Sequence, residues 1–140
     1  MEATHAPRLA LSIDLPIRWG DMDAFGHVNN TVYFRYMEQV RIEWMESLAS
    51  DWTDTGPVIA DATCRFRKPL VYPGTVRISM FIGAAGRSSL PTSYEIRRVD
   101  DGELYADGHS RLVWVSQTTG KPVPLPDALR DAAAPTGETS

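Results

Sequence analysis

Hydrophobic residues recur at helical spacing in the first third of the chain. Between positions 33 and 48 the apolar side chains fall three or four residues apart, at Tyr33, Tyr36, Met37, Val40, Trp44 and Leu48. Charged and amide side chains fill most of the positions between them. An α-helix has 3.6 residues per turn, so this spacing gathers the apolar residues on one face. The pattern predicts an amphipathic helix, with Asn29 or Asn30 as its N-terminal cap.

After this helix the hydrophobic pattern changes to every second residue, which is typical of strands. Strands are predicted at Val58–Phe66 and Val76–Ile82, the first with one buried face. Further strands are expected through Thr92–Ile96, from Leu104 to Ser116, and before the helix from Leu11 to Ile17. Short turns join the later strands, and this order indicates an antiparallel sheet. The sequence therefore predicts an α+β fold with about five strands and one long helix.

The length of 140 residues predicts one domain. We assign it to residues 10–130, preceded by a flexible N-terminus over residues 1–9. The small, polar residues 131–140 predict a disordered tail. One helix cannot cover both faces of such a sheet, and the last predicted strand carries apolar residues at both odd and even positions. That strand is expected to have two covered faces or to cross a subunit interface, which predicts a homodimer or tetramer.

Composition narrows the possible partners and compartments. A net charge of −4 argues against nucleic-acid binding. No run of apolar residues approaches the ~20 that a membrane span needs, and Met1–His5 does not resemble a signal peptide. We therefore expect a cytoplasmic protein. The single cysteine, Cys64, lies where a strand face is predicted to be buried, which indicates a core residue rather than a catalytic thiol.

The loop before the helix carries the candidate chemistry. Asp23, His27, Asn29 and Asn30 stand together just ahead of the predicted helix. A helix N-terminus has unpaired backbone N–H groups and a partial positive charge, which suit a carbonyl oxygen that gains negative charge. Asp23 is placed to attack that carbonyl or to activate a water. The residues alone also allow a structural interpretation, in which Asp23 forms an Asx turn and the asparagines only cap the helix.

Basic residues suggest how a phosphate-bearing substrate is held. Arg65, Arg67 and Lys68, with Arg87 at a turn, are candidates for binding phosphates, although each also fits an ordinary exposed strand face. Ser89 is a candidate partner of the reacting group or a turn residue. The histidines and carboxylates show no metal-ligand spacing, so no metal is expected. A serine hydrolase is not indicated, because the chain has no G-x-S-x-G motif.

The segment RWGDMDAFGHVNNTVYFRYMEQVRIEW resembles the signature of the 4-hydroxybenzoyl-CoA thioesterase-like branch of the hotdog-fold superfamily. FRKPLVYPGT, GRSSLPTSYEI and TTGKPVPLP fit the same pattern in order, so the resemblance covers roughly residues 10 to 130. It implies an antiparallel sheet wrapped around a long central helix, and dimers with composite thioester sites.

The resemblance also implies roles for individual residues. Asp23 matches the family's catalytic carboxylate, and Asn30, seven residues later, matches the position whose backbone N–H polarises the thioester carbonyl. Arg87 and Ser89 fall in the segment that lies beside the coenzyme. His27 and the paired asparagines are similar to plant acyl-carrier-protein thioesterases, in which Asp, Asn and His act together. Phe25 stands here at the position of that Asn, which puts the three-residue arrangement in doubt.

The function implied is hydrolysis of an acyl-CoA thioester, with Asp23 as general base or nucleophile. No cofactor is expected, since coenzyme A is part of the substrate. Phe25, Tyr33 and Tyr36 suit an aromatic or medium-length acyl group, or are simply core residues. The alternatives are a non-catalytic acyl-thioester-binding module and an acyl-carrier-protein thioesterase. A dehydratase of the same fold is less favoured, because those enzymes resemble one another in a His-Phe-Pro-Gly loop that this chain lacks.

Overall fold

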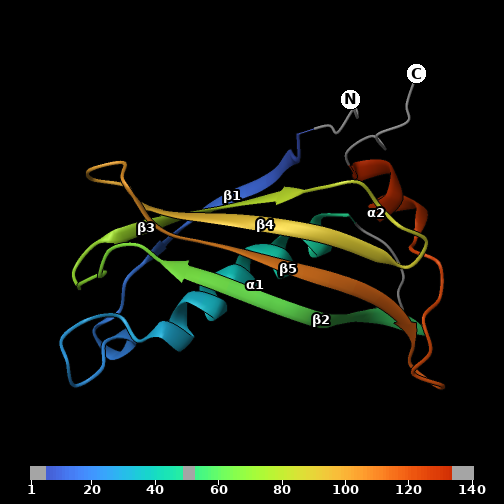
Figure 1. Ribbon diagram of the computed structural model, residues 1–140, viewed down its shortest axis with the longest axis horizontal. Helices are drawn as coiled ribbons and strands as arrows, with labels where there is room; N and C mark the ends of the chain where they lie inside the picture. The colour runs from blue at the N-terminus through green and yellow to red at the C-terminus, as the bar shows by residue number, and fades with distance from the viewer. Residues whose placement is uncertain (1–5, 49–52, 134–140) are drawn as a thin grey trace.

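Five antiparallel strands form a single sheet in the computed structural model, which describes residues 6–48 and 53–133 (Figure 1). The strands are β1 (Arg8–Pro16), β2 (Thr55–Phe66), β3 (Thr75–Ile82), β4 (Ser89–Arg98) and β5 (Leu104–Ser116). Their order in the sheet is β1-β3-β4-β5-β2. A 3-10 turn (Trp19–Asp21) and α1 (Asn30–Ser47) stand between β1 and β2, and a short helix, α2 (Asp127–Ala132), follows β5. The predicted α+β architecture is confirmed.

The helix α1 crosses the inner face of the sheet (Figure 1). Its apolar face is buried, as the helical spacing predicts, through Tyr33, Tyr36, Met37, Val40, Trp44 and Met45. The inward side chains of β3, β4 and β5 complete the core, among them Ile78, Met80, Tyr94, Leu112 and Trp114. Gly108 allows the close approach of helix and sheet, because a Cβ there would lie 2.9 Å from Met37 Sδ and 2.5 Å from the Thr63 carbonyl oxygen.

The strand β2 differs from its predicted burial. Alternation predicted one buried face from Val58 to Phe66, yet the side chains between Pro57 and Thr63 are exposed. The physical reason is position: β2 is an edge strand, and α1 covers little of it. A register shift between Ile59 and Asp61 also interrupts the alternation. The prediction of a buried face was therefore wrong for the single chain.

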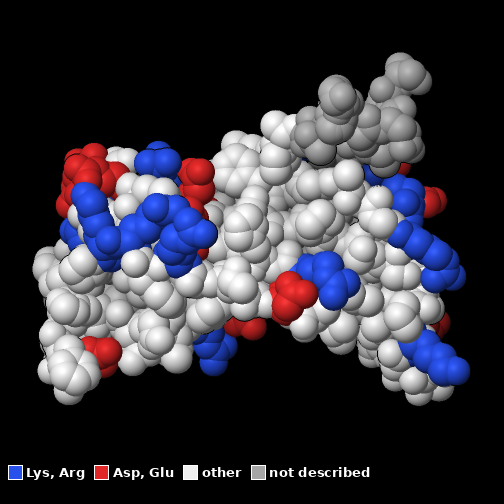
Figure 2. All heavy atoms as spheres, in the orientation of Figure 1, with Lys and Arg blue, Asp and Glu red and all other residues white. Residues whose placement is uncertain are grey.

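The strand β5 has one buried face and one half-exposed face. Ala106, Gly108, Ser110, Leu112 and Trp114 point into the core. The opposite face includes exposed His109 and Arg111, so two covered faces are not present in the single chain. Figure 2 shows that the middle of the outer face carries few charges, while charges of both signs gather at the end that holds the β4–β5 hairpin.

The ends of the domain are more ordered than predicted. β1 begins at Arg8, inside the segment expected to be flexible, because it pairs with β3 over its whole length. The expected tail begins with Asp131 and Ala132, which belong instead to α2. This helix was not predicted, and its Leu129 is fully buried against the core. The remaining expectations of disorder, for residues 1–5 and 134–140, lie outside the described residues.

Candidate active site

The side chain of Asn29 organises the start of α1. Its Oδ1 accepts hydrogen bonds from the Thr31 backbone N–H at 2.9 Å and from the Thr31 hydroxyl at 2.7 Å. Asn29 is therefore the N-cap, and Asn30 is the first helical residue. This result decides between the two asparagines that the sequence left open. The Thr31 N–H is bound to the Asn29 side chain and the Val32 N–H to the Asn29 carbonyl, so among these three first helical N–H groups only that of Asn30 is left without an acceptor in the described residues.

Asp23 is held in the loop by two hydrogen bonds to its carboxylate. Its Oδ1 accepts from the Phe25 backbone N–H at 2.9 Å, which is the Asx turn considered in the sequence. Its Oδ2 accepts from Asn29 Nδ2 at 3.3 Å. One asparagine thus joins the carboxylate to the helix cap. A carboxylate offers about four acceptor positions, so both oxygens keep capacity for a further donor such as water.

The Asn30 backbone N–H has no hydrogen-bond acceptor within the part of the chain that the structure describes. Asn30 lines a cavity of about 260 Å³ together with His27, Val28, Tyr33, Phe66, Arg67, Lys68 and Pro69. Five of the residues singled out in the sequence therefore meet in one cavity, namely His27, Asn30, Tyr33, Arg67 and Lys68. Asp23 is half-buried and precedes the lining residue His27 by four positions. Its backbone N–H donates to the His27 carbonyl at 2.9 Å.

Aromatic and basic side chains form the walls of this cavity. The rings of Tyr33 and Phe66 meet edge to face, with centroids 5.0 Å apart. Arg67 donates to Asp107 at 2.8 Å, and this guanidinium lowers the pKa of the Asp107 carboxyl. Lys68 pairs with Glu103 and lies 5.6 Å from the centroid of the Tyr105 ring. Both ion pairs are partly exposed, so they contribute little stability and can exchange for a phosphate.

Arg87 and Ser89 do not join the cavity of the same chain. Ser89 is paired with Val113 on β5, whereas Phe66 at the cavity is paired with Ala106. Seven residues of strand separate these levels, or about 23 Å at a rise of ~3.3 Å per residue. The Arg87 carbonyl instead accepts hydrogen bonds from the Leu125 N–H and from Arg130 Nη2, both at 2.9 Å, beside α2.

Asp21, for which the sequence indicated no role, binds Tyr36, which the sequence suggested as an acyl-group contact or a core residue. Tyr36 Oη donates to Asp21 Oδ2 at 2.9 Å, and the same oxygen accepts from the Arg18 backbone N–H. Burial and this hydrogen bond both raise the pKa of the Tyr36 phenol. The Asp21 carbonyl also accepts from the Asn29 N–H at 2.9 Å. Asp21 therefore fixes the loop to the helix. No local sequence signal pairs two residues that stand fifteen positions apart.

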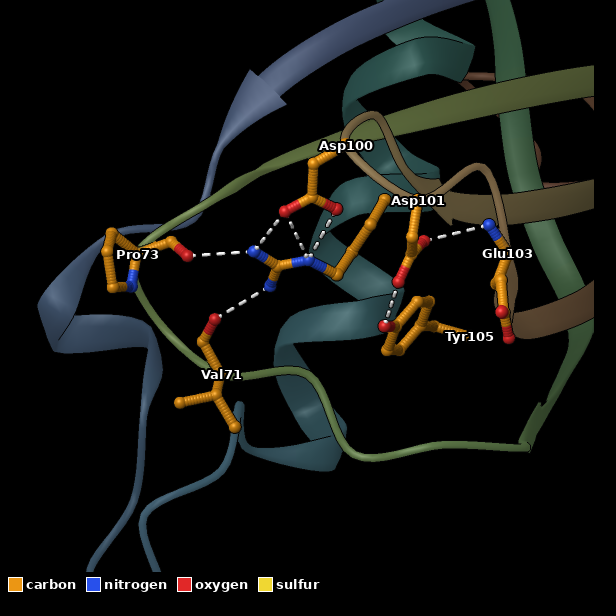
Figure 3. Close-up of polar contacts among 7 residues, drawn as sticks. Val71, Pro73, Asp100, Asp101, Glu103 and Tyr105 are labelled. Atoms are coloured by element: carbon orange, nitrogen blue, oxygen red, sulfur yellow. Dashed lines mark hydrogen bonds and ion pairs between the residues drawn. The ribbon is translucent and has the colours of Figure 1, made fainter.

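Backbone hydrogen bonds from residues 70–74 hold both ends of the segment that contains the Asp23 loop. The Val28 N–H donates to the Leu70 carbonyl at 2.8 Å, and the Ile17 N–H donates to the Gly74 carbonyl at 2.8 Å. Figure 3 shows the carbonyls of Val71 and Pro73 pointing at one guanidinium, which belongs to Arg98 at the end of β4. Residues 70–74 thus connect the β4–β5 hairpin to the Asp23 loop.

The other polar groups near the site carry no comparable arrangement. Cys64 is half-buried, and burial raises the pKa of its thiol to about 11, with a smaller effect from Asp107. The described ranges contain no group of three or more His, Cys, Asp and Glu side chains placed to hold a metal ion. Among the same residues, no helix is long and apolar enough to cross a membrane.

Comparison with known proteins identifies the family of this site. A family model described as the thioesterase-like superfamily matches residues 17–133. The chain belongs to this superfamily. Its fold matches the PA2801 protein of Pseudomonas aeruginosa with a TM-score of 0.83 and 38% identity, covering 91% of this chain and 100% of that one. The fold is therefore the hotdog fold expected from the resemblance.

Two curated relatives align with most of the chain. YsmA of Bacillus subtilis is 32% identical over 117 residues, which is 82% of this chain and 79% of YsmA. FadM of Escherichia coli, a long-chain acyl-CoA thioesterase, is 23% identical over 125 residues, covering 86% of this chain and 95% of FadM. The family model and the relatives that are named thioesterases, FadM among them, identify this member of the thioesterase-like superfamily as a thioester hydrolase.

Proposed function

We propose that this thioesterase hydrolyses an acyl-CoA thioester, with Asp23 as general base or nucleophile. The observation that carries the proposal is the start of α1, where Asn30 lines a cavity and has no acceptor for its backbone N–H among the described residues, and where the capping Asn29 also holds the Asp23 carboxylate. FadM, which is named an acyl-CoA thioesterase, supports a coenzyme A thioester as substrate class. An acyl group of aromatic or medium length fits the Tyr33 and Phe66 walls.

The Asn30 N–H supplies the electrophilic half of the mechanism. As the thioester carbonyl is attacked, its oxygen gains negative charge, and a backbone N–H at a helix N-terminus stabilises that charge. The donor is fixed before the substrate arrives, because the Asn29 cap sets the geometry of the first turn. Such a preorganised donor loses little free energy to reorganisation during the reaction.

Asp23 supplies the nucleophilic half in one of two ways. As a general base it takes a proton from a water that attacks the carbonyl carbon, and the thiolate of coenzyme A leaves. As a nucleophile it attacks the same carbon itself, forms a mixed anhydride and releases the thiolate, and water then cleaves the anhydride. The contacts from Phe25 and Asn29 hold the carboxylate in place for either route.

The charged groups around the cavity suit the coenzyme. Arg67 and Lys68 line the cavity and are paired only with partly exposed carboxylates, so the phosphates of coenzyme A can replace those partners. Arg87 and Ser89 lie about 23 Å away along β5. We place them in the composite site of a homodimer or tetramer, in which they serve the cavity of a second copy.

A hydrolysis screen tests the proposal. The purified protein is incubated with a panel of aliphatic and aromatic acyl-CoA thioesters and one acyl-carrier-protein thioester, and free thiol release is followed. We expect turnover of at least one acyl-CoA and a fall in kcat of about 10²–10⁴-fold in Asp23→Asn. Asp54→Asn, which changes a surface carboxylate outside the loop, is the control and should retain activity.

The alternatives have distinct outcomes in the same screen. Binding of acyl-CoA by calorimetry without any turnover identifies a non-catalytic binding module. Turnover of the carrier-protein thioester alone assigns the other thioesterase class. Near-normal turnover by a folded Asp23→Asn protein contradicts the role of Asp23.

A further inference from the structure

A second cavity, of about 250 Å³, is lined by residues of α1, β2 and β5. Its lining comprises Thr31, Phe34, Arg35, Met37, Glu38, Arg41, Ile59, Ala62 and Ser110. The two elements run in opposite directions (Figure 1), since the end of β2 at Phe66 contacts Tyr33 near the start of α1. Earlier residues of β2 therefore lie beside later residues of α1. From the cavity at Asn30 to the cavity at Arg41, the lining residues therefore advance along α1 and go back along β2.

Three buried hydroxyl groups stand behind this cavity. Thr92 Oγ1 lies 2.8 Å from Tyr94 Oη and 2.5 Å from Ser110 Oγ, and Tyr94 Oη lies 3.0 Å from Ser110 Oγ. Arg41 Nη1 donates to Tyr94 Oη at 3.1 Å. One direction of donation satisfies the whole chain: Arg41 to Tyr94, Tyr94 to Ser110, Ser110 to Thr92, and Thr92 to the Ser110 carbonyl. The network fixes the Arg41 guanidinium against the sheet.

The Arg41 guanidinium has unused hydrogen-bonding capacity. Within the described residues it forms no ion pair, and its Nε and Nη2 groups have no acceptor. Glu38 lines the same cavity, but its carboxylate is bound to Arg35 at 3.1 Å. The side chain of Arg41 is half-buried, among apolar neighbours that include Met37 and Ile59. A guanidinium edge with two free N–H groups fits a carboxylate in a bidentate pair.

We propose that Arg41 binds a carboxylate at the far end of the acyl group, so that the substrate class is ω-carboxyacyl thioesters. The inference rests on the thioesterase function proposed above and specifies its acyl group. Ala62 is paired with Ser110, and Phe66 stands four residues farther along β2, so the reacting end and the guanidinium lie about 13 Å apart along the strand. An extended acyl chain of medium length spans this distance, with its methylene groups against Phe34, Met37 and Ile59.

Three thioesters of equal chain length test this inference. They are octanoyl-CoA, ω-hydroxyoctanoyl-CoA and the mono-CoA thioester of octanedioic acid. Steady-state kcat/KM should favour the carboxylate over octanoyl by about 10- to 100-fold, the range for a charge-assisted hydrogen-bonded pair. Arg41→Met should abolish this preference and leave octanoyl hydrolysis unchanged. Arg41→Lys should keep part of it, because the charge remains without the planar fork.

Two further variants separate orientation from net charge. Tyr94→Phe removes the hydroxyl that anchors Arg41, so the preference should fall several-fold while octanoyl turnover is kept. Arg8→Gln removes one positive charge at the start of β1. It should change neither the turnover of octanoyl-CoA nor that of the octanedioic thioester. Equal turnover of all three thioesters overturns the inference, and so does an Arg41→Met variant that loses activity on all three equally. A preference for the hydroxyl compound overturns the assignment to a carboxylate.

Binding measurements keep this inference separate from the proposed hydrolysis. In the Asp23→Asn background, calorimetry should show tighter binding of the octanedioic thioester than of octanoyl-CoA, and Arg41→Met should remove the difference. Absence of turnover with every thioester overturns the proposed hydrolysis. Absence of the difference in binding overturns the role of Arg41.

Discussion

The guanidinium of Arg98 fills the space in which a side chain on residue 74 would have to lie. A Cβ at residue 74 would therefore have to displace the end of the Arg98 side chain. Arg98 is 14% exposed, and it donates to the carbonyls of Val71 and Pro73 at 2.9 Å each. These contacts hold the segment on which the Val28 end of the Asp23 loop rests.

Gly74→Ala should lower the free energy of unfolding by about 1–3 kcal/mol, because Arg98 must leave its position or the segment must move. Urea unfolding measures the change. Gly20→Ala is the matched control, since a Cβ there has no neighbour within 4 Å and should shift stability by no more than about 0.5 kcal/mol. Equal stability of both variants would contradict the close approach.

Asn29 joins capping to the carboxylate, and two substitutions separate these roles. Asn29→Asp keeps a capping oxygen, loses the donor to Asp23 and adds a like charge. We expect little change in Tm with a fall in kcat of about 10-fold or more. Asn29→Ala removes both contacts and should also cost about 1 kcal/mol of stability. Thermal unfolding and kcat are measured together, and full activity of Asn29→Asp rules out a positioning role.

His27 is exposed and lines the cavity, but its side chain has no hydrogen-bond partner among the described residues. Its backbone carbonyl, not its imidazole, holds Asp23. We therefore expect His27→Gln to lower kcat only modestly, and the pH–rate profile to keep the same limbs. A folded His27→Gln protein as inactive as Asp23→Asn would show instead that the imidazole takes part in the reaction.

Cys64 makes the stability of the folded protein depend on pH in a predictable direction. Burial raises the pKa of its thiol to about 11, above the value of 9.0 for an unperturbed thiol. The folded state therefore holds the proton more tightly, and this contribution to stability is fully present below pH 9.0 and lost as the pH rises toward about 11. Cys64→Ala should flatten the loss of stability over that interval, as measured by urea unfolding. Slow alkylation of the native thiol at neutral pH is also expected.

The exposed edge strand and the outer face of the sheet predict self-association. Val58 is 46% exposed on β2, at the free edge of the sheet. Light scattering should find a dimer or tetramer, and Val58→Lys should weaken that assembly. Val99→Lys, in the β4–β5 hairpin with 43% exposure, is the matched control. A stable and active monomer at micromolar concentration contradicts the composite site.

The local pattern of the sequence determined the elements of this fold. Helical spacing located α1, alternation located β2 and β3, and the turns around the last strand delimited β5 at its observed limits, Leu104–Ser116. These periodicities are local, because each side chain's direction is set by its own backbone. The loop signature likewise pointed to Asp23 and to the start of α1, because a cap and the first free N–H groups are adjacent in sequence.

Only the tertiary structure decided which faces are covered and which residues meet. Alternation along β2 reads as a buried face, yet its position at the edge of the sheet leaves it exposed. Arg41, Tyr94 and Ser110 come from three elements, and Arg98 reaches the turn before β3 from the end of β4. Such contacts depend on strand order and on how the helix crosses the sheet. Neither is encoded in the spacing of neighbouring residues, because long-range packing places side chains that no local period relates.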